Sequence, residues 1–122
     1  MIRTEGLGHI DLAVSDVSRS LAFYQGVFGM TVLFSDGPDE YFLRTPGARD
    51  VIGISKAEKR APGAKGGIGH FGFRLVNHKD MDEAIATVTS LGGKLLRRGG
   101  EDVNSYAYVT DPDGYEIEFF CD

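Results

Sequence analysis

The chain has 122 residues, of which 42% are hydrophobic and 25% charged, and this is the size and composition of one globular domain. Its formal net charge of -5 would repel a phosphate backbone and no basic cluster offsets that charge, so nucleic acid is not expected as a partner. No apolar run approaches the roughly 20 residues of a membrane helix, and no signal segment opens the chain, which predicts a cytoplasmic protein without a membrane partner.

The first half of the chain predicts a strand, a helix and three further strands. Alternation in GLGHIDLAV, residues 6–14, is typical of a half-buried strand. Asp16 is expected to open a helix that stops at Gly29, because a short polar cap and a terminal glycine are the usual boundary signals. The apolar face of this helix is expected at Val17, Leu21, Tyr24 and Phe28. Three strands are expected after it, at residues 30–35, 41–45 and 51–55.

Residues 56–67, KAEKRAPGAKGG, are rich in glycine, proline and charge and are predicted to be a linker. Such a segment could reach a neighbouring module or a second chain. The letters G-x-G-x-x-G at residues 67–72 open a strand instead of a helix, so no dinucleotide cofactor is expected.

The second half repeats the first. GIGHFGFRL, residues 67–75, matches GLGHIDLAV position for position, which indicates a duplicated module. Asp80, with Glu83 three residues on, is expected to open a helix that stops at Gly92. The inward face of that helix is expected at Met81, Ala84, Ile85, Val88 and Leu91. Three strands are expected after it, at residues 94–98, 105–109 and 115–120.

These elements predict an α+β fold: one domain over residues 1–122, built from tandem β-α-β-β-β modules at 1–55 and 68–122. The strands are expected to form a curved mixed sheet with the helices on its convex face. The single cysteine, Cys121, cannot form an internal disulfide and is expected to be a spare thiol.

Strand alternation places His9, His70 and Glu118 on the face opposite the apolar residues. Taken alone, each histidine would be an ordinary hydrogen-bonded residue and the glutamate a solvated one. Repetition of the histidine in both modules favours a shared ligand, and two imidazoles with one carboxylate are a donor set for a metal ion with open positions. His78 has no counterpart in the first module and is expected to be an ordinary loop histidine.

Three segments resemble the vicinal-oxygen-chelate superfamily, which includes glyoxalase I, fosfomycin-resistance transferases, bleomycin-resistance proteins and extradiol dioxygenases. They are GHIDLAVSDVSRSLAFYQGVFGM, GHFGFRL and YVTDPDGYEIEFF, and the resemblance covers essentially the whole chain. It implies that His9, His70 and Glu118 are the metal ligands and that Glu116 points outward.

The resemblance to particular members is mixed. Where glyoxalase I has a fourth ligand, a glutamate, this chain has Gly53 or Ser55, and Ala13 replaces an arginine that binds glutathione. Fosfomycin-type enzymes share Tyr108, but Asp11 replaces their threonine.

Extradiol dioxygenases share the three ligands, Tyr108 and the FLR segment at residues 42–44. Their histidine pair before the next strand is replaced here by Arg49 and Asp50. Bleomycin-type binders generally lack the three ligands.

The resemblance therefore predicts an enzyme that uses a divalent metal ion and a small substrate chelating it through two adjacent oxygens. A dioxygenase with Fe²⁺ is favoured, with Mn²⁺, Ni²⁺ or Zn²⁺ possible, and Tyr108 is the candidate catalytic donor or acid. The alternatives are a lyase, isomerase or thiol transferase, or a metal-free protein that sequesters an antibiotic or aromatic ligand. A homodimer is expected, with His9 from one chain and His70 and Glu118 from the other.

Overall fold

The computed structural model describes residues 1–122 and contains two compact units, Met1–Ala61 and Pro62–Asp122. The boundary between them falls inside the segment predicted to be a linker. Each unit contains one copy of the repeat.

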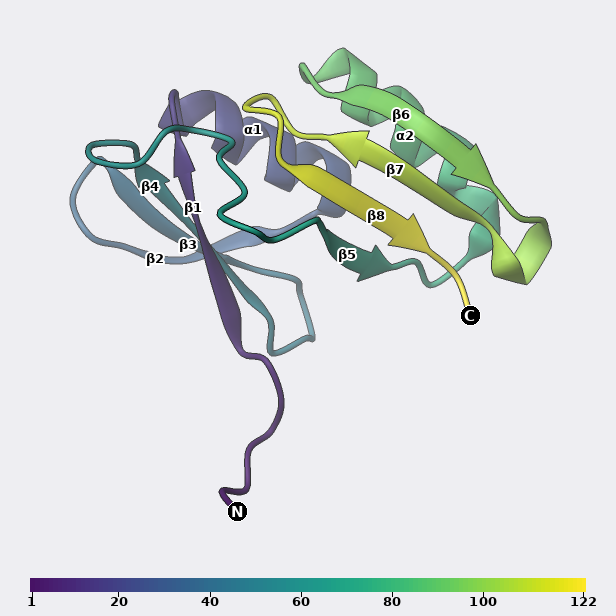
Figure 1. Ribbon diagram of the computed structural model, residues 1–122, viewed down its shortest axis with the longest axis horizontal. Helices are drawn as coiled ribbons and strands as arrows, with labels where there is room; N and C mark the ends of the chain where they lie inside the picture. The colour runs from purple at the N-terminus through teal and green to yellow at the C-terminus, as the bar shows by residue number, and fades with distance from the viewer. The chain divides into compact units, whose positions relative to one another are not determined.

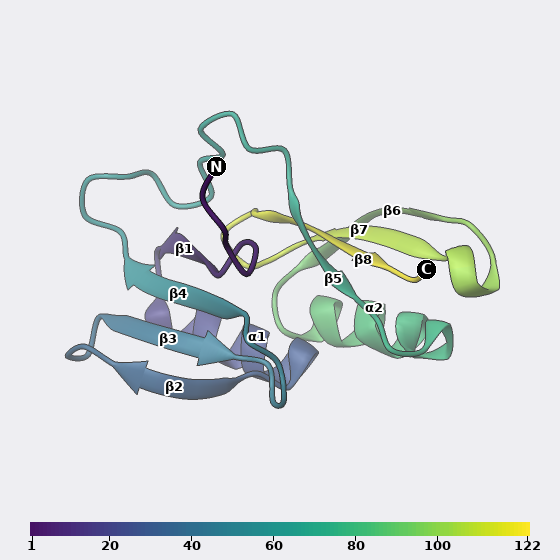
Figure 2. The ribbon, with the colours of Figure 1, turned by 90° about the horizontal axis from the view of Figure 1, so that it is seen from below.

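The first unit contains one mixed four-stranded sheet and one helix (Figure 1). The strand order is β1-β4-β3-β2, with β1 parallel to β4 and the other neighbours antiparallel. Figure 2 shows β2, β3 and β4 side by side. The elements are β1 (His9–Val14), α1 (Val17–Phe28), β2 (Thr31–Ser35), β3 (Glu40–Arg44) and β4 (Val51–Lys56).

Helix α1 begins and ends where its sequence predicts. The Asp16 carboxylate accepts a hydrogen bond from the Arg19 N–H at 3.0 Å, and Gly29 ends the helix with a left-handed φ of 64°. Its buried face is shifted from the expected one: Ser20 and Phe23 are fully buried beside Tyr24, whereas the other predicted apolar positions are only half-buried. The helix packs on β4, and this contact fixes which side chains face inward.

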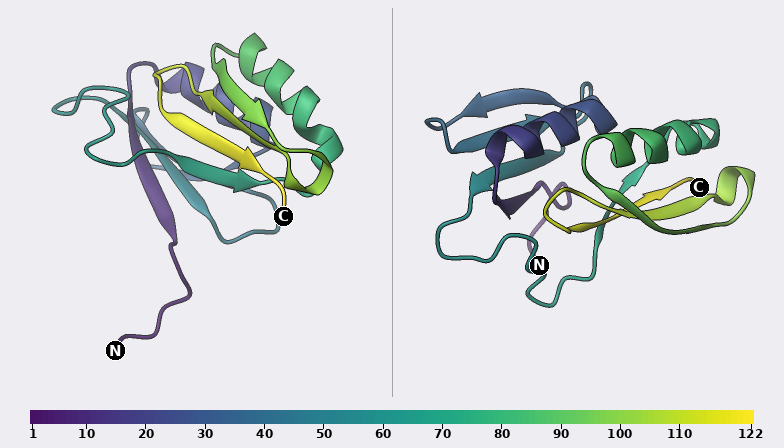
Figure 3. Two further views of the ribbon diagram at one scale, coloured as in Figure 1. Left: turned by 45° about the vertical axis from the view of Figure 1, so that its right-hand side comes forward. Right: turned by 90° about the horizontal axis from the view of Figure 1, so that it is seen from above.

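The second unit repeats this architecture with strand order β5-β8-β7-β6. Strand β5 is parallel to β8, and the other neighbours are antiparallel. In Figure 3 each helix lies along one face of the sheet of its own unit. The elements are β5 (Phe71–Arg74), η1 (His78–Asp80), α2 (Met81–Ser90), β6 (Lys94–Gly99), η2 (Asp102–Asn104), β7 (Tyr106–Thr110) and β8 (Glu116–Phe120).

The start of α2 differs from the expected capping box. Asp80 occupies the cap position but makes no side-chain hydrogen bond to the helix. Instead a short 3₁₀ turn precedes the helix, and Asn77 caps that turn by accepting a hydrogen bond from the Lys79 N–H at 3.0 Å. Asp80 is the last residue of this turn and has right-handed helical dihedral angles, whereas a residue that caps a helix through its side chain normally has an extended backbone.

The core of the second unit lies between α2 and one face of the sheet. Ala107 and Val109 on β7 and Ile117 and Phe119 on β8 are fully buried. Because strand side chains alternate, the residues between them, including Tyr108 and Glu118, lie on the opposite face. That opposite face is where the candidate site residues of this unit lie.

The structure confirms the predicted α+β class and the two β-α-β-β-β modules, each with its own four-stranded sheet. Strand boundaries differ from the predicted ones by one residue at most places, as is usual at element ends. No helix of the chain has the length and apolar character needed to cross a bilayer.

Candidate metal centre

Four residues form a continuous row across the open face of the second sheet. Gly72 on β5 is the register partner of Glu118 on β8, Glu118 of Tyr108 on β7, and Tyr108 of Arg97 on β6. We call Gly72, Glu118, Tyr108 and Arg97 the unit 2 row. Neighbouring strands lie about 4.8 Å apart, so side chains on successive strands of this row are within reach of one another.

His70 joins the unit 2 row from the residue just before β5. Its Nε2 lies 3.3 Å from Oε2 of Glu118, and its ring meets the Tyr108 ring edge to face with centroids 5.0 Å apart. The His70 side chain is 38% exposed and that of Glu118 24% exposed, so both side chains are partly accessible to solvent. Of the three residues predicted to share a face, His9, His70 and Glu118, the structure brings His70 and Glu118 together within this unit.

His70 and Glu118 are placed as two of the three predicted metal ligands would be. An imidazole nitrogen and a carboxylate oxygen at this separation can serve the same small cation, and both types are common ligands of divalent metals. Neither unit by itself assembles three His, Cys, Asp or Glu side chains in a metal-binding arrangement. The third predicted ligand, His9, belongs to the first unit, where it begins β1 and is exposed.

Glu116, two residues from Glu118 on β8, has a partner of its own. The Lys65 ammonium donates a hydrogen bond to its carboxylate at 2.9 Å. This hydrogen bond and the charge of Lys65, with smaller contributions from Arg97 and His70, lower the pKa of Glu116. The two glutamates of the closing strand therefore have different contacts.

The first unit carries an equivalent row with different residues. By register, Asp11 on β1 pairs with Gly53 on β4, Gly53 with Phe42 on β3, and Phe42 with Phe34 on β2. We call Asp11, Gly53, Phe42 and Phe34 the unit 1 row. His9 stands two residues before Asp11, just as His70 stands two residues before Gly72, so the repeat places both histidines at the same point of their sheets.

The carboxylate and the glycine exchange strands between the two rows. Glu118 lies on the last strand of its unit beside Gly72, whereas Asp11 lies on the first strand beside Gly53. A Cβ at Gly53 would come within 2.6 Å of the Asp11 carboxylate, which fills that space and accepts a hydrogen bond from Ser55 Oγ at 2.8 Å. Asp11 and Ser55 also line a pocket of about 260 Å³.

Arg97 is a site residue that the sequence interpretation missed. Its guanidinium carbon lies 3.8 Å from the centroid of the Tyr108 ring, a stacked cation–π arrangement. The register of β6 shifts between Leu95 and Arg97, and this irregularity places Arg97 opposite Tyr108. Bulges of this kind redirect a side chain and leave little trace in the sequence. The one available signal is the adjacent pair of arginines in LLRRGG, because neighbouring strand residues point to opposite faces of the sheet.

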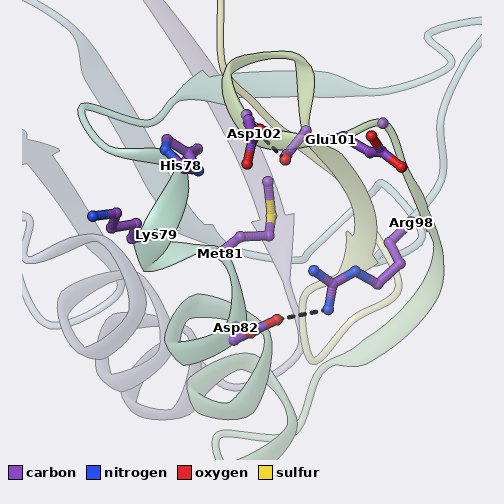
Figure 4. A pocket seen from close by; sticks show the side chains of 9 residues that line it. His78, Lys79, Met81, Asp82, Arg98, Glu101 and Asp102 are labelled. Carbon is purple, nitrogen blue, oxygen red and sulfur yellow. Dashed lines mark hydrogen bonds and ion pairs between the residues drawn. The ribbon is translucent and has the colours of Figure 1, made fainter.

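A pocket in the second unit is lined by none of the unit 2 row and by none of the predicted ligands (Figure 4). It has a volume of about 390 Å³ and is lined mainly by charged residues of η1, α2, β6 and η2. Arg98 faces this pocket and pairs with Asp82 at 2.7 Å. His78, expected to be an ordinary loop histidine, lines the same pocket.

Comparison with known proteins identifies the family. The sequence profile of the Glyoxalase/Bleomycin resistance protein/Dioxygenase superfamily matches residues 6–119. Since this match spans nearly the entire chain, the protein belongs to that superfamily, as the resemblance of its motifs predicts.

Relatives within the superfamily catalyse different reactions. A lactoylglutathione lyase of Haemophilus influenzae is 33% identical over 121 residues, which cover 91% of this chain and 88% of the relative. The metallothiol transferase FosB of Lysinibacillus sphaericus is 30% identical over 122 residues, covering 94% of this chain and 81% of the relative. A catechol-2,3-dioxygenase of Bacillus subtilis is 28% identical, with 95% of this chain and 41% of the relative covered.

Solved structures share the fold at lower identity. The fosfomycin resistance protein FosX of Listeria monocytogenes superposes with a TM-score of 0.76 at 22% identity, over 97% of this chain and 91% of FosX. A variant of the same protein, complexed with Mn(II) and a dihydroxypropylphosphonic acid, gives a TM-score of 0.77 at 23% identity, over 97% of this chain and 90% of that chain.

Proposed function

We propose that this protein is a divalent-metal enzyme whose ion is held by His9, His70 and Glu118. The observation that carries the proposal is the contact of His70 with Glu118 on an open sheet face, beside Tyr108, in a chain whose first unit repeats the histidine. A set of two imidazoles and one carboxylate leaves open coordination positions, and a small substrate would occupy two of them through adjacent oxygens.

We further propose that the working protein is a homodimer in which His9 comes from one chain and the pair of His70 and Glu118 from the other. Each unit alone offers at most a partial ligand set, and two sheets with exposed edge strands have surface to cover. The predicted cytoplasmic location stays a prediction.

At this site the protein itself would have to position the substrate and to donate or accept a proton. A bound divalent ion would supply polarisation of the substrate oxygens and stabilisation of developing negative charge. Tyr108 is the candidate proton donor: its ring is held between His70 and Arg97, and its hydroxyl is on the same face as the ligands. Glu118 and His70 would orient the substrate by fixing where its chelating oxygens can bind.

Two reactions are proposed in order. Oxygen-dependent cleavage of a catechol-like substrate with Fe²⁺ comes first, because two histidines and one carboxylate are the ligand set of non-haem iron oxygenases. Isomerisation or thiol addition comes second and is supported by the lyase and transferase relatives, which are more similar to this chain than the dioxygenase is.

The test is metal analysis of protein purified without chelator, followed by turnover assays. The proposal expects about one Fe²⁺, Mn²⁺, Ni²⁺ or Zn²⁺ ion per chain. Oxygen uptake with catechols in air would support the dioxygenase, and oxygen-independent turnover of a glutathione hemithioacetal under argon would support the lyase. Protein that takes up no metal but binds aromatic ligands would overturn the proposal in favour of a sequestering protein.

A further inference from the structure

We propose that Arg97 recognises an anionic group on the substrate, so that the preferred substrate carries a carboxylate or similar oxyanion in addition to its two chelating oxygens. This inference rests on the proposed function, because it places the substrate on His70 and Glu118. It concerns the end of the unit 2 row that lies away from the ligands.

The position of Arg97 fits such a role. Glu118 and Arg97 are separated by one strand, so their backbones lie roughly 10 Å apart. The guanidinium leans over the Tyr108 ring at 3.8 Å, which brings it toward the ligand side of the row. A substrate that chelates the metal ion held by Glu118 and extends across Tyr108 would therefore place its far end at Arg97.

The donors of Arg97 are available. Glu116, which interacts electrostatically with Arg97, is already hydrogen-bonded to Lys65 at 2.9 Å, and the Arg97 guanidinium stacks on Tyr108 without an ion pair or hydrogen bond of its own. Stacking on an aromatic ring fixes the plane of a guanidinium but leaves its N–H groups free at the edge, where they match the two oxygens of a carboxylate. An exposed arginine held flat in this way is prepared to bind an anion at small entropic cost.

The first unit shows that the fold does not need a charge at this position. The equivalent residue after the β2 register shift is Phe34, which stacks on Phe42 with centroids 4.4 Å apart. An apolar stack therefore satisfies the same place in the same architecture. The adjacent Arg98 pairs with Asp82 of α2, so it is Arg97 and not Arg98 that brings a positive charge to the open face beside Tyr108.

The experiment compares catechol with protocatechuate, which is catechol bearing a carboxylate. Both are titrated calorimetrically into protein loaded with Mn²⁺ under argon, so that binding is measured without turnover. We expect protocatechuate to bind at least about tenfold more tightly than catechol, because a charge-assisted pair with arginine is added.

Three variants make the result specific. Arg97→Gln and Arg97→Phe should bind the two ligands about equally. Arg97→Phe introduces an aromatic stack like that of Phe34 on Phe42 in the first unit, so it is the variant expected to keep the packing at this position. Arg98→Gln, which removes the neighbouring charge on the other face, should keep the wild-type preference.

Equal affinity of the wild type for both ligands, a preference that survives Arg97→Gln, or failure of protocatechuate to bind would overturn the inference. The metal content of Glu118→Gln distinguishes failure of the inference about Arg97 from failure of the proposed metal site. If that variant binds Mn²⁺ like the wild type, the metal site itself is wrong; if it loses the metal while Arg97→Gln keeps the preference, only the role of Arg97 is wrong.

Discussion

Two glutamates on β8 stand two residues apart on the same face, and their neighbours distinguish them. Glu118 lies 3.3 Å from His70, whereas Glu116 is held by Lys65 at 2.9 Å. A carboxylate that is already neutralised by an ammonium is a poor choice for a metal ion, since binding the metal would require breaking that pair. The structure thus gives a physical basis for treating the two acids differently.

Glu118→Gln is expected to weaken binding of Mn²⁺ by at least the roughly 10-fold to 100-fold that loss of a partner outside the coordination sphere costs, because an amide is an uncharged and poorer donor. Glu116→Gln, the matched control, should bind nearly as the wild type does. Calorimetric titration of the chelator-treated proteins measures both. Wild-type affinity in both variants would mean that these acids only keep one face of the strand solvated.

The pair of Lys65 and Glu116 predicts a pH effect on stability. Lys65 lowers the folded-state pKa of Glu116 below its ordinary value of 4.5. A depressed carboxyl pKa contributes stability that is present above pH 4.5 and is lost as the pH falls through the folded-state pKa. The difference in thermal midpoint between the wild type and Glu116→Gln should therefore be largest near neutral pH and shrink on acidification; a difference that is constant with pH would rule out this pair as its source.

At the level of elements, the two helices start differently although their sequences look alike. Asp16 caps α1 through a hydrogen bond to the Arg19 N–H, whereas Asp80 makes no such bond and α2 instead follows a 3₁₀ turn capped by Asn77. Composition and spacing cannot distinguish these cases, because both acids precede a helical apolar pattern.

Replacement of the caps by alanine tests this difference. Asp16→Ala is expected to lower the free energy of unfolding by about 1 kcal/mol, and Asp80→Ala by clearly less. Chemical denaturation of both variants gives the comparison directly. An equal loss at the two positions would indicate that Asp80 caps α2 in solution.

The order of the elements and the shared face of His70 and Glu118 were predictable, because alternation and capping are local properties of the sequence. Burial of Phe23 and the placement of Arg97 were not. The first depends on how α1 rotates against β4, and the second on a register shift in β6. Both are set by contacts between segments distant in sequence, which a periodic pattern does not report.

For the whole molecule, mixed subunits test the proposal that His9 comes from one chain and His70 from the other. His9→Gln and His70→Gln should each abolish metal binding. If the site is shared between chains, co-refolding the two variants produces heterodimers with one intact site, so metal binding returns to about half of the heterodimer sites. If one chain supplies all three ligands, every site in the mixture lacks one histidine and binding stays absent.

The register shifts that place Phe34 and Arg97 lie in β2 and β6, and each of these is an edge strand of its sheet. These edges expose apolar side chains, among them Leu33 and Leu96 at 43% and 45%. A straight apolar edge is a template for adding further chains without limit, and a bulge interrupts that template. We therefore expect the register shift in β6 to protect the protein against aggregation: deletion of Leu96, which removes the extra residue, should yield larger species than the wild type forms in sedimentation velocity, whereas Leu96→Ala should not.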